Sequence, residues 1–211
     1  GAGVTGLAAA RRLGELKPDA RIILLDEYRV GYGTSGRNAG FIIDTPHLTE
    51  AFDDTANRRV SRLVIAGLAE LEHQVKKHEI ECEWSPRGHL TAVVESERVD
   101  RLRGLCDMLD AAGEEYEWLD AAALAEVVGT NHYHAAVLTP RTVLVNPAAM
   151  CRGLGDTLPE NVELYEESPV LKVTPGNPVQ LECADGSVTA PNVFLTTNAF
   201  VTKLGLLKRE V

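Results

Sequence analysis

A glycine-rich turn at the start of the chain constrains its fold more than any other feature of the sequence. Gly1, Gly3 and Gly6 form a G-x-G-x-x-G pattern, and an apolar helical period follows them in GAGVTGLAAARRL. Such a turn lets the backbone approach a pyrophosphate closely, and the helix behind it offers N–H groups and a partial positive charge. In a nucleotide-binding fold the turn follows a buried strand, whereas this sequence starts at the turn itself. We therefore expect the chain to be truncated at its N-terminus, just before the turn.

The residues after the turn favour a dinucleotide site. A helix is expected from about Val4 to Leu16, and a buried parallel strand from Ile22 to Leu25. Asp26 ends this strand and lies twenty positions after Gly6 (26 minus 6). That is the spacing expected for a carboxylate that accepts hydrogen bonds from a ribose hydroxyl. A tight turn without a ligand is the alternative, but the position of the acid favours the dinucleotide.

A glycine-rich loop, GYGTSGRNAG at residues 31–40, follows where an NAD-type fold continues into another helix and strand. Its backbone N–H groups and small side chains can surround phosphates and approach a flat ring closely. Arg37 can offset phosphate charge or pair with a nearby acid, and Asn38 can donate to a ring carbonyl or cap a turn. We expect Gly40 to adopt a positive φ and to lie against a ring, with a simple turn end as the alternative. The loop argues against an NAD(P)-dependent dehydrogenase, which is the rival enzyme class.

Composition and charge exclude several classes of function. The chain has 211 residues, 45% of them hydrophobic and 25% charged, which is typical of a soluble globular protein. Its net charge of −10 would repel a nucleic-acid backbone, so no nucleic-acid partner is expected. No run of eighteen apolar residues occurs, so no membrane span is expected. The four cysteines are widely scattered and form no C-x-x-C, which predicts reduced thiols in a cytoplasmic protein.

The rest of the chain mixes helical and strand patterns without an internal repeat. Apolar residues at steps of three and four from Val60 to Val75 predict one long amphipathic helix. Further helices are expected after Ser96, after Asp120 and after Asn146. Strands are expected in RGHLTAVVE, HAAVLTP, TVLV, VELYE, PVLKV, VQLEC, SVTA and NVFLTTN. The order predicts an α/β fold in which an inserted α+β domain interrupts a nucleotide-binding domain.

Five segments carry a resemblance to a known family: GAGVTGLAAARRL, IILLDE, RVGYGTSGRNAGFI, LYEESPVLKV and VFLTTNAF. Together they resemble the FAD-dependent oxidoreductases of the D-amino-acid-oxidase superfamily, to which glycine oxidase, sarcosine oxidase and gamma-glutamylputrescine oxidoreductase belong. The resemblance implies a Rossmann-like FAD-binding domain at residues 1–86 and 146–211. Residues 87–145 would form part of a substrate domain with a mixed or antiparallel sheet.

The resemblance also implies which residues contact FAD. These are Gly1, Gly3, Val4, Thr5 and Gly6 at the pyrophosphate, Asp26 and Glu27 at the adenosine ribose, Thr34 and Ser35 at phosphate or the ribityl chain, Arg37 and Asn38 in the same loop, Ala39, Gly40 and Phe41 at the isoalloxazine, and Val170 at the adenine.

The activity implied is flavin-dependent oxidation of an amine or amino acid, with oxygen or another acceptor taking the electrons. The family's second flavin segment has no match, so we expect truncation at the C-terminus as well. A catalytically incomplete flavin-binding fragment is therefore a further alternative. No residue is assigned a catalytic role: His47 could be a base near the ring, but a residue in this position more often opens a helix. His132 and His134 lack a third ligand within sequence reach, so no metal site is expected.

Overall fold

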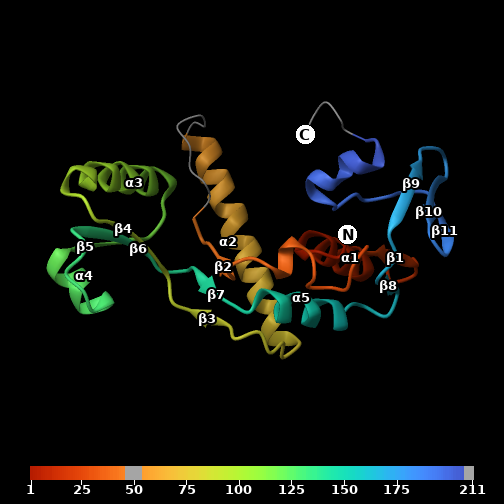
Figure 1. The fold of residues 1–211 in the computed structure, drawn as a ribbon, viewed down its shortest axis with the longest axis horizontal. Helices are drawn as coiled ribbons and strands as arrows, with labels where there is room; N and C mark the ends of the chain where they lie inside the picture. The colour runs from red at the N-terminus through yellow and green to blue at the C-terminus, as the bar shows by residue number, and fades with distance from the viewer. Residues whose placement is uncertain (46–53, 207–211) are drawn as a thin grey trace. The chain divides into compact units, whose positions relative to one another are not determined.

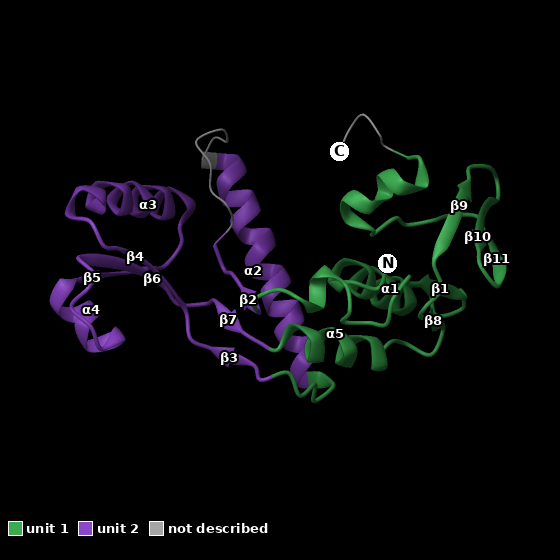
Figure 2. Ribbon diagram, viewed as in Figure 1, with its two compact units in different colours: residues 1–39, 77–82, 146–211 green, residues 40–76, 83–145 purple. Residues whose placement is uncertain are grey.

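The computed structural model describes residues 1–45 and 54–206, which form two compact units (Figures 1 and 2). The first unit comprises residues 1–39, 77–82 and 146–211, and the second comprises residues 40–76 and 83–145. The helices are α1 (Val4–Leu16), α2 (Asp54–Lys77), α3 (Val99–Ala112), α4 (Ala121–Val128) and α5 (Pro147–Asp156), with 3-10 helices η1 (Thr34–Gly36), η2 (Ser96–Arg98) and η3 (Asn198–Leu204). The strands are β1 (Ile22–Leu25), β2 (Phe41–Ile42), β3 (Ser85–Pro86), β4 (His89–Val93), β5 (Glu117–Asp120), β6 (Ala135–Thr139), β7 (Val143–Leu144), β8 (Val162–Tyr165), β9 (Val170–Thr174), β10 (Val179–Cys183) and β11 (Gly186–Ala190).

The first unit is built on a parallel pair of strands. β1 and β8 run side by side with Ile22 opposite Val162, although about 140 residues separate them in the sequence. Helix α1 packs on both strands and on α5, and buries Leu7 in the process. An antiparallel sheet in the order β11-β10-β9 completes the unit. Parallel and antiparallel sheets together confirm the expected mixed α/β fold.

A buried arginine joins α1 to α5. Arg11 lies one helical turn after Leu7, on the same face of α1, and is only 6% exposed. Its Nη2 donates to the carbonyl of Leu154 at 3.0 Å and to Thr157 Oγ1 at 2.8 Å. Its Nη1 lies 3.1 Å from Nε2 of His78. Carbonyl groups at the C-terminal end of α5 carry partial negative charge, so they stabilise the buried guanidinium.

The second unit contains two antiparallel sheets, in the orders β2-β7-β3 and β4-β6-β5. Successive side chains of a strand point to opposite faces, and β6 uses both faces. Ala135 and Val137 pack with Leu102 and Leu109 of α3, whereas Ala136 packs on the other side with Leu124 of α4. Figure 1 shows the sheet between these two helices.

Most of the expected elements are confirmed, because their local signals are strong. α1 and β1 have the predicted bounds. The Asp120 carboxylate caps α4 by accepting the Ala123 N–H, and Asn146 caps α5 in the same way through the Ala149 N–H. α3 ends at Gly113 in the left-handed conformation that glycine adopts readily.

The predicted buried strand in NVFLTTN is wrong. Residues 192–197 form no strand, and the side chains of Phe194 and Leu195 are 72% and 41% exposed. A strand needs a neighbour to satisfy its backbone, and no strand of the described residues pairs with this segment. Thr196 instead donates its hydroxyl to the carbonyl of Gly1 at 2.8 Å, and the chain then enters η3.

The compact units differ in extent from the predicted domains. Residues 40–76 and 83–86 group with the second unit rather than with residues 1–39. The reason is backbone pairing, since β2 and β3 both pair with β7. The assignment of residues 1–86 and 146–211 to FAD binding stays a prediction.

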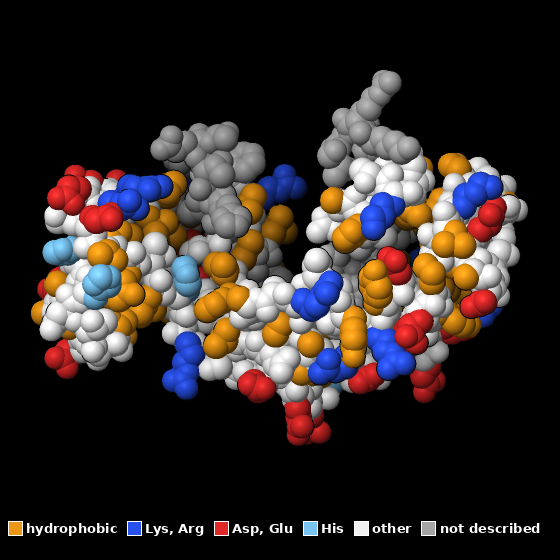
Figure 3. All heavy atoms as spheres, viewed as in Figure 1, with side chains coloured by type: hydrophobic (Ala, Val, Ile, Leu, Met, Phe, Trp, Pro, Cys, Tyr) orange, Lys and Arg blue, Asp and Glu red, His pale blue; other side chains and the backbone are white. Residues whose placement is uncertain are grey.

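The surface and the helices bear on possible partners. On the face shown in Figure 3, acidic and basic side chains of the described residues are interspersed rather than gathered by sign. No helix within the described residues is long and apolar enough to cross a bilayer.

The Arg21–Glu163 ion pair predicts a pH dependence of stability. Arg21 binds the Glu163 carboxylate with two hydrogen bonds of 2.6 and 2.7 Å and thereby lowers the pKa of Glu163 to about 2. The stabilisation is complete above the unfolded-state pKa of about 4.5 and is lost as the pH falls to about 2. We expect Arg21→Gln to lower the melting temperature at pH 7 and to match the wild type at pH 2. Arg12→Gln, which removes an exposed pair within one helix, is the control for a smaller effect. A difference that persists unchanged at pH 2 would contradict this assignment.

Replacing Gly6 with alanine should destabilise the protein, although glycine-to-alanine changes in a helix usually stabilise it. A Cβ at Gly6 would lie 1.8 Å from the carbonyl oxygen of Gly1, so the turn has to move. We expect Gly6→Ala to lower the free energy of unfolding by about 1–3 kcal/mol, the range of an overpacked site. Gly67→Ala in α2 is the matched control, since its Cβ would meet nothing within 4 Å. The control should raise stability by up to about 1 kcal/mol, because alanine favours helix. Urea unfolding of both variants measures the contrast, and equal effects would rule out the steric explanation.

Candidate functional site

The glycine turn lies at the N-terminus of α1. Gly3 is the N-cap residue and has no side chain to cap the helix, so the first turn depends on other partners. The backbone N–H of Val4 donates to Ser35 Oγ at 3.2 Å. A Cβ at Gly3 would lie 2.8 Å from the same oxygen, so the absence of a side chain permits this contact. The turn and η1 therefore form one surface at the positive end of the helix dipole.

Asp26 holds the turn from the other side. Its Oδ2 accepts the Ala2 N–H at 2.5 Å, and its Oδ1 accepts the Tyr28 N–H at 2.8 Å. The Asp26 carbonyl also accepts the Ser168 N–H at 2.8 Å. The sequence did not predict the hydrogen bond from Ala2 to Asp26. The spacing between Gly6 and Asp26 is the same whether the carboxylate binds a ligand or the turn itself. A carboxylate has about four acceptor positions, so Asp26 keeps the capacity to bind ribose hydroxyls while it holds the turn.

The loop at residues 31–40 is shaped by close backbone contacts. A Cβ at Gly36 would lie 2.0 Å from the Gly31 carbonyl oxygen, and Gly31 has a φ of +86°. Asn38 donates its amide to the carbonyls of Thr34 and Ser35 at 3.3 and 2.8 Å, which is the turn-capping role that the sequence left open.

Other predicted residues of the first unit are open to solvent. Thr5, Glu27, Thr34, Arg37 and Ala39 are exposed. Within residues 1–45 and 54–206, Arg37 forms no ion pair with an acid, so the salt-bridge alternative is not observed there.

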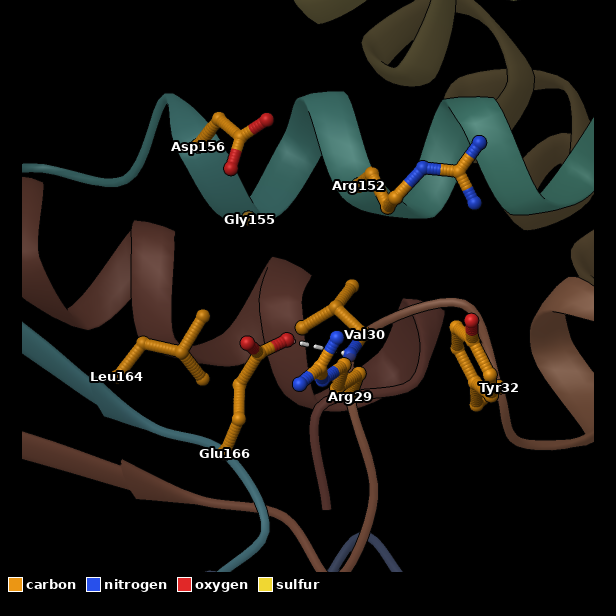
Figure 4. Close-up of a pocket in the computed structure, with 8 residues that line it drawn as sticks. All are labelled: Arg29, Val30, Tyr32, Arg152, Gly155, Asp156, Leu164 and Glu166. Carbon is orange, nitrogen blue, oxygen red and sulfur yellow. Dashed lines mark hydrogen bonds between the residues drawn. The ribbon is translucent and has the colours of Figure 1, made fainter.

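Two cavities lie beside the segment that follows Asp26. The first, of about 370 Å³, is shown in Figure 4. It is lined by Arg29, Val30, Tyr32, Arg152, Gly155, Asp156, Leu164 and Glu166. Glu166 Oε1 accepts the Val30 N–H at 2.6 Å and so ties the loop to the end of β8. Two cations and two acids line this cavity, which therefore has no excess of either charge.

The second cavity, of about 500 Å³, adjoins the predicted adenosine residues. It is lined by Glu27, Tyr28, Arg29, Tyr32, Glu167 and Pro169. Val170 follows Pro169 directly as the first residue of β9. The sequence did not single out Arg29, Tyr32 or Glu167, since exposed loop residues of these types give no local signal.

Gly40 and Phe41 belong to the second unit. Gly40 has a φ of +79°, which confirms the expected positive φ, and its carbonyl accepts the Val145 N–H at 2.9 Å. Phe41 begins β2 and is 53% exposed. Its ring meets the His89 ring edge-on, with 6.4 Å between the centroids.

The remaining candidates gain little support. Among the described residues, no three His, Cys, Asp or Glu side chains are placed to hold a metal ion. The ring of His132 packs edge-on against Tyr133. None of the four cysteines, all of which lie in the described part of the chain, forms a disulfide bond, and burial raises the pKa of Cys151, which makes it a poor nucleophile. His47 lies outside the described residues.

Comparisons with known proteins agree with this geometry. The chain is 26% identical over 207 residues to gamma-glutamylputrescine oxidoreductase of Escherichia coli K12, a match that covers 95% of this chain and 48% of that protein. Its fold is similar to glycine oxidase from Geobacillus kaustophilus, with a TM-score of 0.82, 19% identity and coverage of 97% of this chain and 55% of that one. It is also similar to L-amino acid deaminase from Proteus myxofaciens, with a TM-score of 0.74, 17% identity and coverage of 91% and 43%.

The chain spans about half the length of the curated relatives it matches. The sequence profile of the family described as "FAD dependent oxidoreductase" matches residues 1–211, which is the whole chain. The glycine turn, the acid at the end of β1 and this match lead to one conclusion: the chain belongs to the family of FAD-dependent oxidoreductases.

Proposed function

We propose that the complete protein uses FAD to oxidise a C–N bond of an amine or amino acid. The observation that carries the proposal is the meeting of the Asp26 carboxylate with the glycine turn at the N-terminus of α1. This arrangement puts an acceptor for ribose hydroxyls next to backbone donors for phosphate. The names of two similar proteins, gamma-glutamylputrescine oxidoreductase and glycine oxidase, support an amine or amino acid as the substrate class.

The residues of the first unit fit the nucleotide half of FAD. The backbone of Gly1, Gly3, Val4, Thr5 and Gly6 would hold the pyrophosphate at the positive end of α1. The hydroxyls of Thr34 and Ser35 lie in the loop beside this turn, and the exposed Arg37 can offset phosphate charge. Asp26 and Glu27 would hold the adenosine ribose, and Val170 would meet the adenine beside the 500 Å³ cavity.

The segment from Asn38 to Phe41 would face the flavin ring. Ala39 and Gly40 bring little side-chain bulk, and the half-exposed ring of Phe41 can pack against a planar ligand. Bound FAD would supply the acceptor for a hydride equivalent from the substrate carbon; the imine product would be hydrolysed by water, and oxygen or another acceptor would take up the electrons. The residues of this chain would bind FAD and orient its ring, and this chemistry does not require a dedicated base among them.

Two alternative functions are an NAD(P)-dependent dehydrogenase and a flavin-binding protein without catalytic turnover. An NAD(P)-dependent dehydrogenase is disfavoured by membership of the FAD-dependent family. A flavin-binding protein without turnover uses the same turn and the same Asp26, so only activity separates it from an oxidoreductase.

The role of Asp26 is tested by comparing it with its neighbour. Asp26→Ala in the complete protein should weaken FAD binding by about 1.5–3 kcal/mol, because charge-assisted hydrogen bonds are lost. Asp26→Glu should be milder, and Glu27→Ala should weaken FAD binding less than Asp26→Ala does, because the Glu27 carboxylate is more exposed to water. Equilibrium dialysis with FAD measures the binding, and melting temperatures show how much of the loss comes from the bond to Ala2. Unchanged binding in Asp26→Ala together with loss in Glu27→Ala would move the ribose contact to residue 27.

The activity itself is tested with the purified complete protein. We expect a yellow protein whose flavin absorption bleaches when it is mixed without oxygen with one member of a panel of primary amines, secondary amines and amino acids. Imine hydrolysis should release an aldehyde, ketone or keto acid in equal amount. A colourless protein that binds NADH or NADPH would refute the proposal. A flavoprotein that no member of the panel reduces would instead support flavin binding without amine oxidation.

A further inference from the structure

A buried carboxylate lies three residues after Phe41 in the second unit. Asp44 is only 2% exposed. Its Oδ1 accepts hydrogen bonds from Thr139 Oγ1 at 3.0 Å and from Thr142 Oγ1 at 2.7 Å, and its Oδ2 accepts the Arg141 N–H at 2.8 Å. The Asp44 N–H donates back to Thr142 Oγ1 at 3.2 Å. We call Asp44, Thr139, Arg141 and Thr142 the Asp44 cluster.

Burying the Asp44 carboxylate is energetically unfavourable compared with burying an apolar side chain at the same position. Taking a carboxylate out of water is unfavourable unless its oxygens find donors, and here three donors converge on it. All three come from residues 139–142, which are the last residue of β6 and the connection from β6 to β7. Because hydrogen bonds are directional, this set of donors fixes one position of Asp44 relative to the connection.

The same connection organises the segments around Phe41. β2 pairs with β7 over only two residues, Phe41 opposite Leu144 and Ile42 opposite Val143. So short a ladder constrains the backbone weakly on its own. The bond from Val145 to the Gly40 carbonyl holds one end of residues 40–44, and the Asp44 cluster holds the other.

The connection also reaches the beginning of β4. The Thr142 carbonyl accepts the Gly88 N–H at 3.0 Å, and His89 follows with its ring against Phe41. The Arg141 side chain binds Glu114 at 2.8 Å and Glu115 at 3.0 Å. The connection therefore has supports that do not depend on Asp44, and a change at Asp44 should release β2 rather than unfold the unit.

We propose that Asp44 is a positioning residue that fixes the orientation of Gly40 and Phe41 toward the flavin. This inference rests on the proposed function, which assigns those two residues to the ring. Asp44 acts through the backbone of β2 and touches neither the cofactor nor the substrate. The 53% exposed Phe41 is then a side chain held open by a backbone that is fixed at both ends.

The test separates the two halves of FAD. ADP carries the adenosine and the two phosphates but no flavin ring, so its binding depends on the residues assigned to the nucleotide half of FAD, all of which lie in the first unit. In the complete protein, Asp44→Asn keeps one acceptor oxygen for the two threonine hydroxyls but turns an N–H₂ group toward the Arg141 N–H. We expect FAD affinity to fall by about tenfold or more, as for one lost buried hydrogen bond, while ADP affinity stays unchanged. The visible circular dichroism of the remaining bound flavin should also change.

Two further variants keep the test decisive. Thr139→Val removes one donor at constant shape and should shift FAD affinity in the same direction by a smaller factor. Asp120→Ala removes a capping carboxylate from α4 in the same unit and should leave both affinities and the flavin spectrum unchanged. Should Asp44→Asn fail to fold, Thr139→Val carries the comparison.

Each outcome has one meaning. Wild-type FAD affinity and flavin spectrum in Asp44→Asn or in Thr139→Val would overturn the positioning role. Equal loss of ADP and FAD would overturn it as well, because it would show a general structural role. If the wild-type protein binds neither ADP nor FAD, the proposed function fails first, and the role of Asp44 toward a flavin fails with it.

Discussion

The hydrogen bond between the Asp26 carboxylate and the Ala2 N–H is the constraint on which the first unit depends. It joins the end of β1 to the turn before α1, so the helix begins at a fixed place relative to the strand. Through its carbonyl, Asp26 also holds Ser168, just before β9. One residue, through its side chain and its backbone, thus connects the turn, the parallel strand pair and the antiparallel sheet. The residue that would bind ribose is also the residue that builds the place where ribose would bind.

Local signals account for what the sequence could predict. Helix caps such as Asp120 and Asn146 act within three residues, and left-handed glycines such as Gly113 act within one turn. Such signals determine the bounds of an element almost irrespective of the rest of the fold. The glycine turn and Asp26 act over a longer but still regular distance, since one helix and one strand place Asp26 twenty positions after Gly6. For this reason the first unit's candidate site was within reach of the sequence.

Contacts between distant residues account for what the sequence did not predict. Asp44 binds partners that lie 95 to 98 residues away, and no spacing rule relates them. The segment NVFLTTN has the composition of a strand, yet whether it becomes one depends on a neighbour that local composition cannot supply. The two-residue strand β2 is likewise created by its partner β7 rather than by propensity. The cavities beside Asp26 were missed for the same reason, because the walls of the first come from three separate segments and those of the second from two.

The packing of Gly36 against Gly31 has a consequence for how a protein of this kind can change. At this point the backbone of Gly36 lies directly against the backbone of Gly31. The loop can adopt this shape only because Gly36 has no Cβ atom. A surface made in this way offers no side chain at those positions for selection to exchange. Adjustment of the loop is left to its exposed positions, such as Thr34, Arg37 and Ala39. The glycines therefore restrict the backbone conformation of the loop, whereas its exposed side chains can be substituted. Substitutions at the exposed positions can change what the loop binds without changing its backbone conformation.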